Sequence, residues 1–136
     1  MELLVVIAII GVLAGIVLVS LTGARNRAKD TRIQADLTQV RSIAELIYDA
    51  EPATGYTNLC SGGGLNAGHS LYGSQLGTIA TDISTQNGGV APTCAATSSQ
   101  YCVSAKLASG GYACISDAGS LMTTSTDPCT SWQGCH

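Results

Sequence analysis

The most prominent pattern in the chain is an uninterrupted apolar run near its start. Every residue from Leu3 to Val19 is Leu, Val, Ile, Ala or Gly, and the run continues past Ser20 to Leu21. As an α-helix with a rise of about 1.5 Å per residue, this run approaches the roughly 30 Å hydrocarbon thickness of a bilayer. A cleaved signal peptide fits less well, because the run is long, has no preceding basic residue and lacks a clear small-x-small cleavage site. We therefore expect a membrane-spanning or bundled helix.

An amphipathic helical pattern follows this run. Apolar residues recur at spacings of four, three, four and three, which places them on one face of an α-helix. These residues are Ile33, Leu37, Val40, Ala44 and Ile47. A residue before proline is pushed out of the helical conformation, so Glu51-Pro52 should end the element. We predict a continuous helix from Glu2 to about Asp49, on the order of 70 Å long.

The C-terminal half contains a hairpin pattern. Two β-prone runs, Gln100–Leu107 and Tyr112–Ser116, are separated by a turn that contains Gly-Gly. Because a two-stranded hairpin is marginal alone, we expect a further strand at Ser120–Thr124 and packing against the amphipathic helix. The segment from Glu51 to Thr97 is rich in Gly, Ser and Thr and is predicted to be a long loop. The predicted fold class is α+β, with a long N-terminal helix whose C-terminal half packs on a small antiparallel sheet.

Composition divides the chain into three parts. Residues 1–21 form the apolar segment, residues 22–51 the amphipathic half of the same helix, and residues 52–136 a cysteine-rich domain of loops and sheet. A length of 136 residues is too short for two full-sized cores. The chain has no Phe, and its few aromatic residues are dispersed along the sequence.

All six cysteines lie in the third part, and an even number in a small polar domain predicts disulfides and an oxidising compartment. Buried or metal-bound thiols are the alternative, but the sequence has no Cys-x-x-Cys pair. Among the many possible connectivities we predict one bridge, Cys129–Cys135, because its short loop can close locally. The predicted disulfide residues are Cys60, Cys94, Cys102, Cys114, Cys129 and Cys135.

Charge is unevenly distributed along the chain. The formal net charge is −3, and Lys106 is the only basic residue after Arg41, so the C-terminal half has no footprint for nucleic acid. The positive-inside rule would place the basic cluster after the apolar run in the cytoplasm, whereas disulfides require an oxidising space, and we follow the cysteines. This cluster is either solvated or paired with acids of adjacent copies. Its members are Arg25, Arg27, Lys29 and Arg32, and the candidate acids are Asp30, Asp36 and Glu2.

Glu2 is a costly residue at the edge of an apolar helix, and three glycines are weak points of the long helix. Glu2 is either hydrated at headgroup depth or neutralised in a polymer by a cation of the next subunit. Gly11, Gly15 and Gly23 each cost about 1 kcal/mol relative to alanine, which permits local unwinding of the helix on assembly.

The string Glu-Leu-Leu-Val-Val-Ile-Ala-Ile-Ile-Gly-Val-Leu-Ala, from Glu2 to Ala14, resembles the mature N-terminus of type IV pilins and pseudopilins. The resemblance is strong over roughly residues 1–50, and the hairpin is similar in general plan. Members of this family carry a basic leader and begin with an N-methylated Phe a few residues before the glutamate, whereas here Met1 directly precedes Glu2. The resemblance implies assembly contacts at Glu2, Leu3, Val5, Val6, Ile9, Ile10, Gly11, Leu13 and Ala14.

The same resemblance implies the partners and the location. The precursor is expected in the inner (cytoplasmic) membrane, where it meets a leader peptidase and the pilus assembly machinery, and the mature chain in an extracellular helical homopolymer. We expect a major pilin that serves adhesion, motility or DNA uptake. The alternatives are a pseudopilin of a type II secretion or competence machine, and a membrane-anchored surface binding domain.

The sequence offers no catalytic arrangement. His69 and His136 are far from any nucleophile with an orienting acid, so we expect no enzyme and no cofactor. Three acids, Asp82, Asp117 and Asp127, could bind calcium as in some pseudopilins, although scattered acids are more often solvated.

Overall fold

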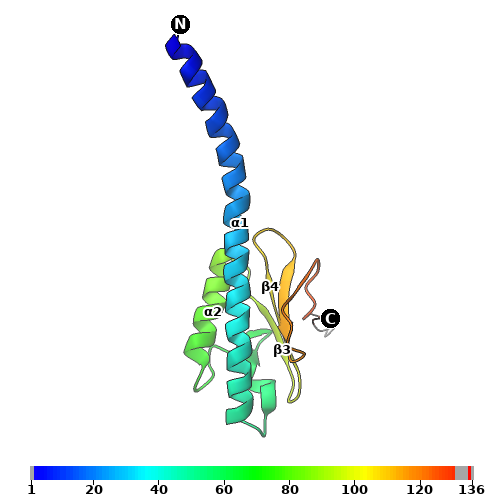
Figure 1. Cartoon of the computed structure of the whole chain (residues 1–136). Helices are drawn as coiled ribbons and strands as arrows, with labels where there is room; N and C mark the ends of the chain where they lie inside the picture. Colours follow the sequence, from blue (N-terminus) through cyan, green and yellow to red (C-terminus); the bar gives the residue numbers. More distant parts are fainter. Residues whose placement is uncertain (1, 131–134, 136) are drawn as a thin grey trace.

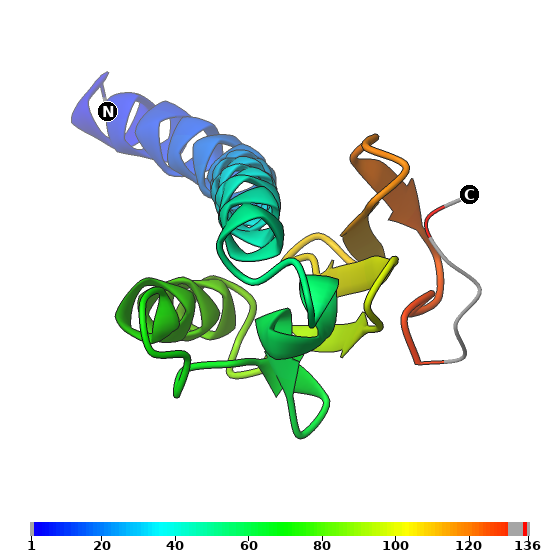
Figure 2. The same ribbon diagram turned by 90° about the horizontal axis from the view of Figure 1, so that it is seen from below.

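The computed structural model describes residues 2–130 and Cys135, leaving out the side chain of Glu2. A long helix, α1 (Glu2–Ala50), protrudes from a small domain, and its C-terminal half packs against a second helix and a four-stranded sheet (Figure 1). The second helix, α2 (Gly73–Gln86), and the sheet lie on different sides of α1 (Figure 2). The predicted α+β class, with a long N-terminal helix on a small antiparallel sheet, is confirmed.

Helix α1 has the predicted length and ends one residue beyond the predicted end. The Glu51 N–H still donates to the Ile47 carbonyl at 2.9 Å, but Pro52 has no N–H with which to continue the ladder. The five stripe residues from Ile33 to Ile47 are fully buried. They pack in one core with Leu76 and Ile83 of α2 and with side chains of the sheet. The 3.6-residue period therefore predicted the packed face of the helix correctly.

The sheet has the order β3-β4-β5-β6, and all of its pairings are antiparallel. The strands of the sheet are β3 (Thr93–Ala96), β4 (Tyr101–Lys106), β5 (Tyr112–Ser116) and β6 (Met122–Thr124). Strands β4 and β5 form the predicted hairpin, and β6 is the predicted additional strand, shorter than expected.

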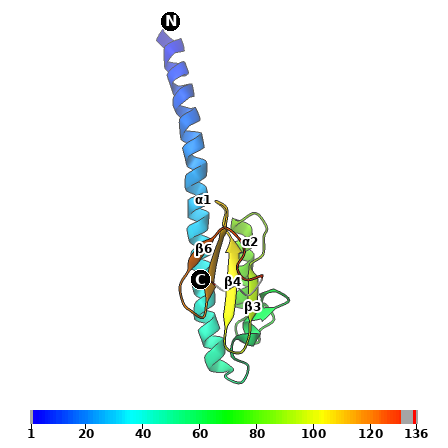
Figure 3. The same cartoon turned by 90° about the vertical axis from the view of Figure 1, so that its right-hand side faces the viewer.

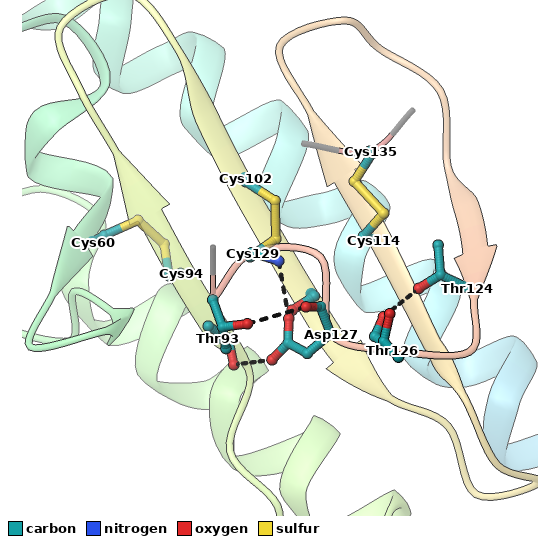
Figure 4. Close-up of a disulfide and its surroundings, with 12 residues drawn as sticks. Cys60, Thr93, Cys94, Cys102, Cys114, Thr124, Thr126, Asp127, Cys129 and Cys135 are labelled. Atoms are coloured by element: carbon teal, nitrogen blue, oxygen red, sulfur yellow. Dashed lines mark hydrogen bonds between the residues drawn. A yellow bond between two sulfur atoms is a disulfide. The ribbon is translucent and has the colours of Figure 1, made fainter. Parts of the chain in front are cut away.

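The central strands bury side chains on both faces of the sheet. On β4, Tyr101, Val103 and Ala105 join the core under the helices, whereas the alternate residues Cys102 and Ser104 point to the opposite face and are also buried. The chain after β6, residues 125–130 and Cys135, crosses this second face and is called here the C-terminal segment (Figures 3 and 4). The sheet is thus enclosed between α1 and the chain's own C-terminal segment.

Two disulfides and one carboxylate attach the C-terminal segment to the sheet (Figure 4). Cys102–Cys129 joins it to β4 and Cys114–Cys135 joins it to β5. Between them, Asp127 accepts hydrogen bonds from the hydroxyls of Thr93 and Ser104, which are cross-strand partners. The carboxylate also accepts the N–H of Cys129 at 3.0 Å, a bond within the segment itself, whereas the two hydroxyl bonds fix the segment to the sheet.

All six cysteines are disulfide-bonded, as predicted, but the predicted bridge Cys129–Cys135 is wrong. Each of these two cysteines instead bonds to a strand, and the third bridge is Cys60–Cys94. Neighbouring strands present Cys102 and Cys114 on the same face, where both bond with the segment that crosses them. The disulfide partners of Cys129 and Cys135 are therefore determined by the register of the sheet and not by their short separation in sequence. The loop between Cys129 and Cys135 lies mostly outside the described residues.

The prediction of a long loop from Glu51 to Thr97 is also wrong. This stretch contains a 3₁₀ turn, η1 (Gly55–Leu59), the short pair β1 (Cys60–Ser61) and β2 (Gly64–Leu65), helix α2 and strand β3. In α2, Leu76, Ile79 and Ile83 are buried at helical spacing. Cys60–Cys94 ties β1 to β3, so both ends of this stretch are fixed.

Three tyrosines that are distant in sequence meet beside the end of α1, so the aromatic residues are less dispersed than expected. The ring centroids of Tyr48 and Tyr56 are 4.7 Å apart, and those of Tyr56 and Tyr101 are 4.9 Å apart. The Tyr56 hydroxyl donates to Glu45, and burial together with this bond raises the pKa of Tyr56 to about 12. The cluster holds η1 between α1 and β4.

Gly55 offers a test of the packing between η1 and the backbone at Ser98. It has a φ of +57°, and a Cβ there would lie 1.8 Å from the Ser98 carbonyl oxygen. Gly62 has a similar φ of +60° but open space around it. We expect Gly55→Ala to lower the free energy of unfolding by about 2–5 kcal/mol, and Gly62→Ala by only about 1–2 kcal/mol. Urea unfolding of the full chain in detergent micelles measures both, and equal losses would contradict the predicted clash.

Candidate functional site

The first part of α1 is the candidate site because it presents apolar side chains that its own domain does not cover. From Leu3 to Leu21, every large apolar side chain is at least 42% exposed. None of residues 3–25 is buried, and Asp30 is the first buried side chain among those that the structure describes in α1. Helix α1 contains a segment with a mean hydropathy of 3.1, long and apolar enough to anchor the chain in a membrane.

Such a surface is unstable in water. Monomeric soluble proteins rarely expose large contiguous apolar patches, and burying each Leu, Ile or Val side chain gains about 1.5–3 kcal/mol. Over this segment the gain amounts to tens of kcal/mol, more than the stability of a typical domain. The segment is therefore expected to be covered by apolar surroundings, such as a membrane would provide.

Two shallow grooves run along this helix surface. One is lined by Leu4, Val5, Ala8, Ile9, Val12 and Leu13. The other is lined by Gly11, Val12, Gly15, Ile16, Val19 and Ser20. Grooves between side-chain ridges are the features into which the ridges of a second helix pack.

All of the predicted assembly residues except Glu2 are described with their side chains, and these lie on the exposed apolar surface. Glu2 is the first residue of α1, but its side chain lies outside the described part, so its predicted role stays a prediction. The exposed members are Leu3, Val5, Val6, Ile9, Ile10, Gly11, Leu13 and Ala14.

Helix α1 also continues through Gly11, Gly15 and Gly23 in the single chain. Unwinding on assembly concerns the polymer and remains a hypothesis.

Asp30 and Asp36, two of the acids considered as partners of adjacent copies, are buried within the chain. The Asp30 carboxylate accepts the N–H groups of Ala108 and Ser109, at 2.7 and 3.2 Å, and so holds the β4–β5 turn against α1. Asp36 is buried between α1 and α2. Arg32, one of the four cluster cations, donates from Nε to Asp82 of α2 at 2.6 Å.

Asp36 is an ionisable group in an unfavourable position. Burial, followed by the nearby Asp82 carboxylate, raises its pKa from 3.8 to about 6, and its Oδ2 atom has no hydrogen-bond partner among the described residues. For Asp82 the Arg32 hydrogen bond acts in the opposite direction and lowers the pKa. At neutral pH the α1–α2 contact therefore contains an ionised carboxylate that is less stable there than it is in the unfolded chain.

We expect Asp36→Asn to stabilise the chain at neutral pH. The folded state holds the Asp36 proton to a higher pH than the unfolded chain does. The contribution of this group to the free energy of unfolding is therefore complete below pH 3.8 and is lost as pH rises through about 6. The variant avoids this loss, so its free energy of unfolding at pH 7.5 should be about 1–2 kcal/mol higher than that of the native chain. Urea unfolding in micelles between pH 4 and pH 8 measures it, with the exposed Asp49→Asn as control. A variant that is less stable than the native chain at pH 7.5 would contradict the assignment.

The other polar candidates do not form a site. His69 is buried, accepts the N–H groups of Leu71 and Tyr72 at Nδ1, and has Nε2 3.5 Å from Glu51. It joins the end of α1 to the start of α2. His136 lies outside the described residues. The three acids considered for calcium are not brought together: Asp82 pairs with Arg32, Asp127 holds the C-terminal segment, and the described residues contain no cluster of acids, His or Cys suited to a metal.

Comparisons with models of protein families, with curated proteins and with solved structures found no match to this chain. The function therefore has to be inferred from the residues and geometry above.

Proposed function

We propose that this chain is a structural subunit, a major pilin, of an extracellular helical filament of the type IV pilus kind. The observation that supports this most directly is the division of α1 into two halves. One half is wholly apolar and exposed, and the other is the central packing element of a disulfide-stapled domain. A single rod with these two halves can join the filament core to the filament surface.

The proposed function involves two environments for the apolar half. Before assembly it lies in a membrane, held there by its apolar side chains. On assembly it moves into an axial bundle of identical helices, where the same side chains stay covered and the grooves of α1 receive ridges of neighbouring copies. Because lipid tails and an apolar bundle solvate these side chains about equally, the transfer needs little work against the hydrophobic effect.

The domain suits an exposed position outside the cell. Three disulfides stabilise a small core in an oxidising space. The proposed role is structural and not catalytic. Adhesion, motility and DNA uptake are the functions that such a filament would serve, and its partners would be copies of the chain, a membrane, a leader peptidase and the assembly machinery.

A membrane-anchored surface binding domain is the second candidate, because one helix long and apolar enough to cross a bilayer is all that an anchor needs. Purification of surface filaments and imaging at side-chain resolution distinguishes the two. We expect density for this sequence in every subunit, with residues 3–21 at the filament axis. Recovery of the chain only as a detergent-extracted monomer, without filaments, would contradict the proposal and support the anchor.

A further inference from the structure

A short neck separates the apolar segment of α1 from its globular domain. It comprises residues 22–29, about 12 Å of helix, and all of its residues except Asn26 are exposed. Arg25, Arg27 and Lys29 lie here, half of the six basic residues of the chain, and no acid lies among them. The neck therefore has a local charge of +3 next to the proposed membrane span.

These three cations have no ionic partner within the described part of the chain. The ion pairs found there are Arg32 with Asp82 and His69 with Glu51. The nearest acid in sequence, Asp30, is already bonded to the turn at Ala108 and Ser109. The charges of the neck are therefore free for a partner outside the chain.

The cations surround the helix instead of lining one face. At about 100° per residue, Arg25 and Lys29 lie some 40° apart around the helix, and Arg27 lies on the opposite side, about 200° from each. We call these three cations the basic ring. A protein partner that binds one face of the helix would contact only part of the ring, whereas a charged layer around the helix would contact all three cations.

We infer that the neck binds the anionic headgroups of phospholipids while the chain is held in the membrane. The neck begins directly after Leu21, where the apolar segment ends, so a bilayer that covers this segment places its phosphate layer beside the ring. The basic side chains then reach the headgroups with their charged ends, and their aliphatic stems follow the helix. This inference rests on the membrane-held stage of the proposed function.

The test uses the full chain reconstituted in phosphatidylcholine vesicles that contain a minority of phosphatidylglycerol. Spin-labelled lipids of each type report which headgroup occupies the shell around the helix, and flotation with alkaline extraction reports insertion separately. For the native chain we expect phosphatidylglycerol to be preferred about fivefold, and less at high salt. The triple variant Arg25→Gln, Arg27→Gln, Lys29→Gln should insert equally but show less than about a twofold preference.

Arg41→Gln is the control that removes a positive charge outside the neck, because Arg41 is exposed and lies about 18 Å farther along α1 than Lys29. It should leave the lipid preference unchanged. A native chain that inserts but shows no preference, or a triple variant that retains it, overturns the inference alone. A native chain that does not insert contradicts the membrane stage of the proposed function as well. Loss of filaments in the triple variant, with no lipid preference in the native chain, would assign the ring to a second copy and also overturn the inference.

Discussion

A chain that carries Ile9→Lys is expected to form no filaments, although its domain folds normally. Ile9 is 55% exposed and lines the first groove of α1, so it should face neighbouring helices in a bundle. A lysine there buries an unpaired charge in every subunit at a cost of about 3–5 kcal/mol, which lowers each association constant more than a hundredfold. Because a polymer repeats this penalty at every position, the expected outcome is loss of assembly.

Electron microscopy of surface preparations measures the effect, and Ile9→Leu is the control that keeps volume and polarity. Membrane fractionation is needed beside it, since a lysine near the middle of the span costs about 2.5–3.5 kcal/mol on insertion as well. The domain should remain intact in either case, because residues 3–25 form no part of its core. Normal filaments from the lysine variant would show that this face does not lie in the filament core.

Removal of both bridges to the C-terminal segment is expected to unfold the domain at 37 °C. The change is Cys→Ser at the four residues of Cys102–Cys129 and Cys114–Cys135. Each bridge is worth about 2–4 kcal/mol, and their sum approaches the whole stability of a small domain. Loss of the segment would also leave Ser104 without its bond to Asp127 and open the second face of β4 to water.

Urea unfolding of the full chain in micelles, followed by far-UV circular dichroism, measures this loss. The two single-bridge variants are the controls, and each should remain folded with an intermediate midpoint. A four-serine variant with the native midpoint would show that the segment contributes little to stability.

The sequence predicted the parts of this molecule in which a local pattern and burial agree. The stripe from Ile33 to Ile47 has the 3.6-residue period that a single packed face imposes. The β4–β5 hairpin was predicted from two β-prone runs on either side of a Gly-Gly turn. Helix α2 was missed, although Leu76, Ile79 and Ile83 have helical spacing, because Gly, Ser and Thr occupy most of its other positions and disfavour helix. For α2, the spacing of the apolar residues was therefore a better indicator of secondary structure than the composition of the segment.

Other features depend on contacts between distant segments. The partners of Cys129 and Cys135 were set by which face of β4 and β5 the chain crosses, and a local loop length could not reveal this. Likewise, nothing near Asp30 or Asp36 in the sequence shows that one holds a turn and the other is buried against α2. The exposure of the apolar segment was easier to predict, because a chain of 136 residues is too small to cover a uniformly apolar helix of this length.

The unbroken helix from Glu2 to Ala50 also fixes the angular phase between the two halves of the molecule. With no joint in the neck, inserting one alanine between Leu21 and Arg25 would rotate the domain by about 100° about the helix axis and lift it by about 1.5 Å. Four such insertions would nearly restore the original facing, one helical turn higher. In the proposed filament, the number of residues in the neck would therefore determine which side of the domain faces outward.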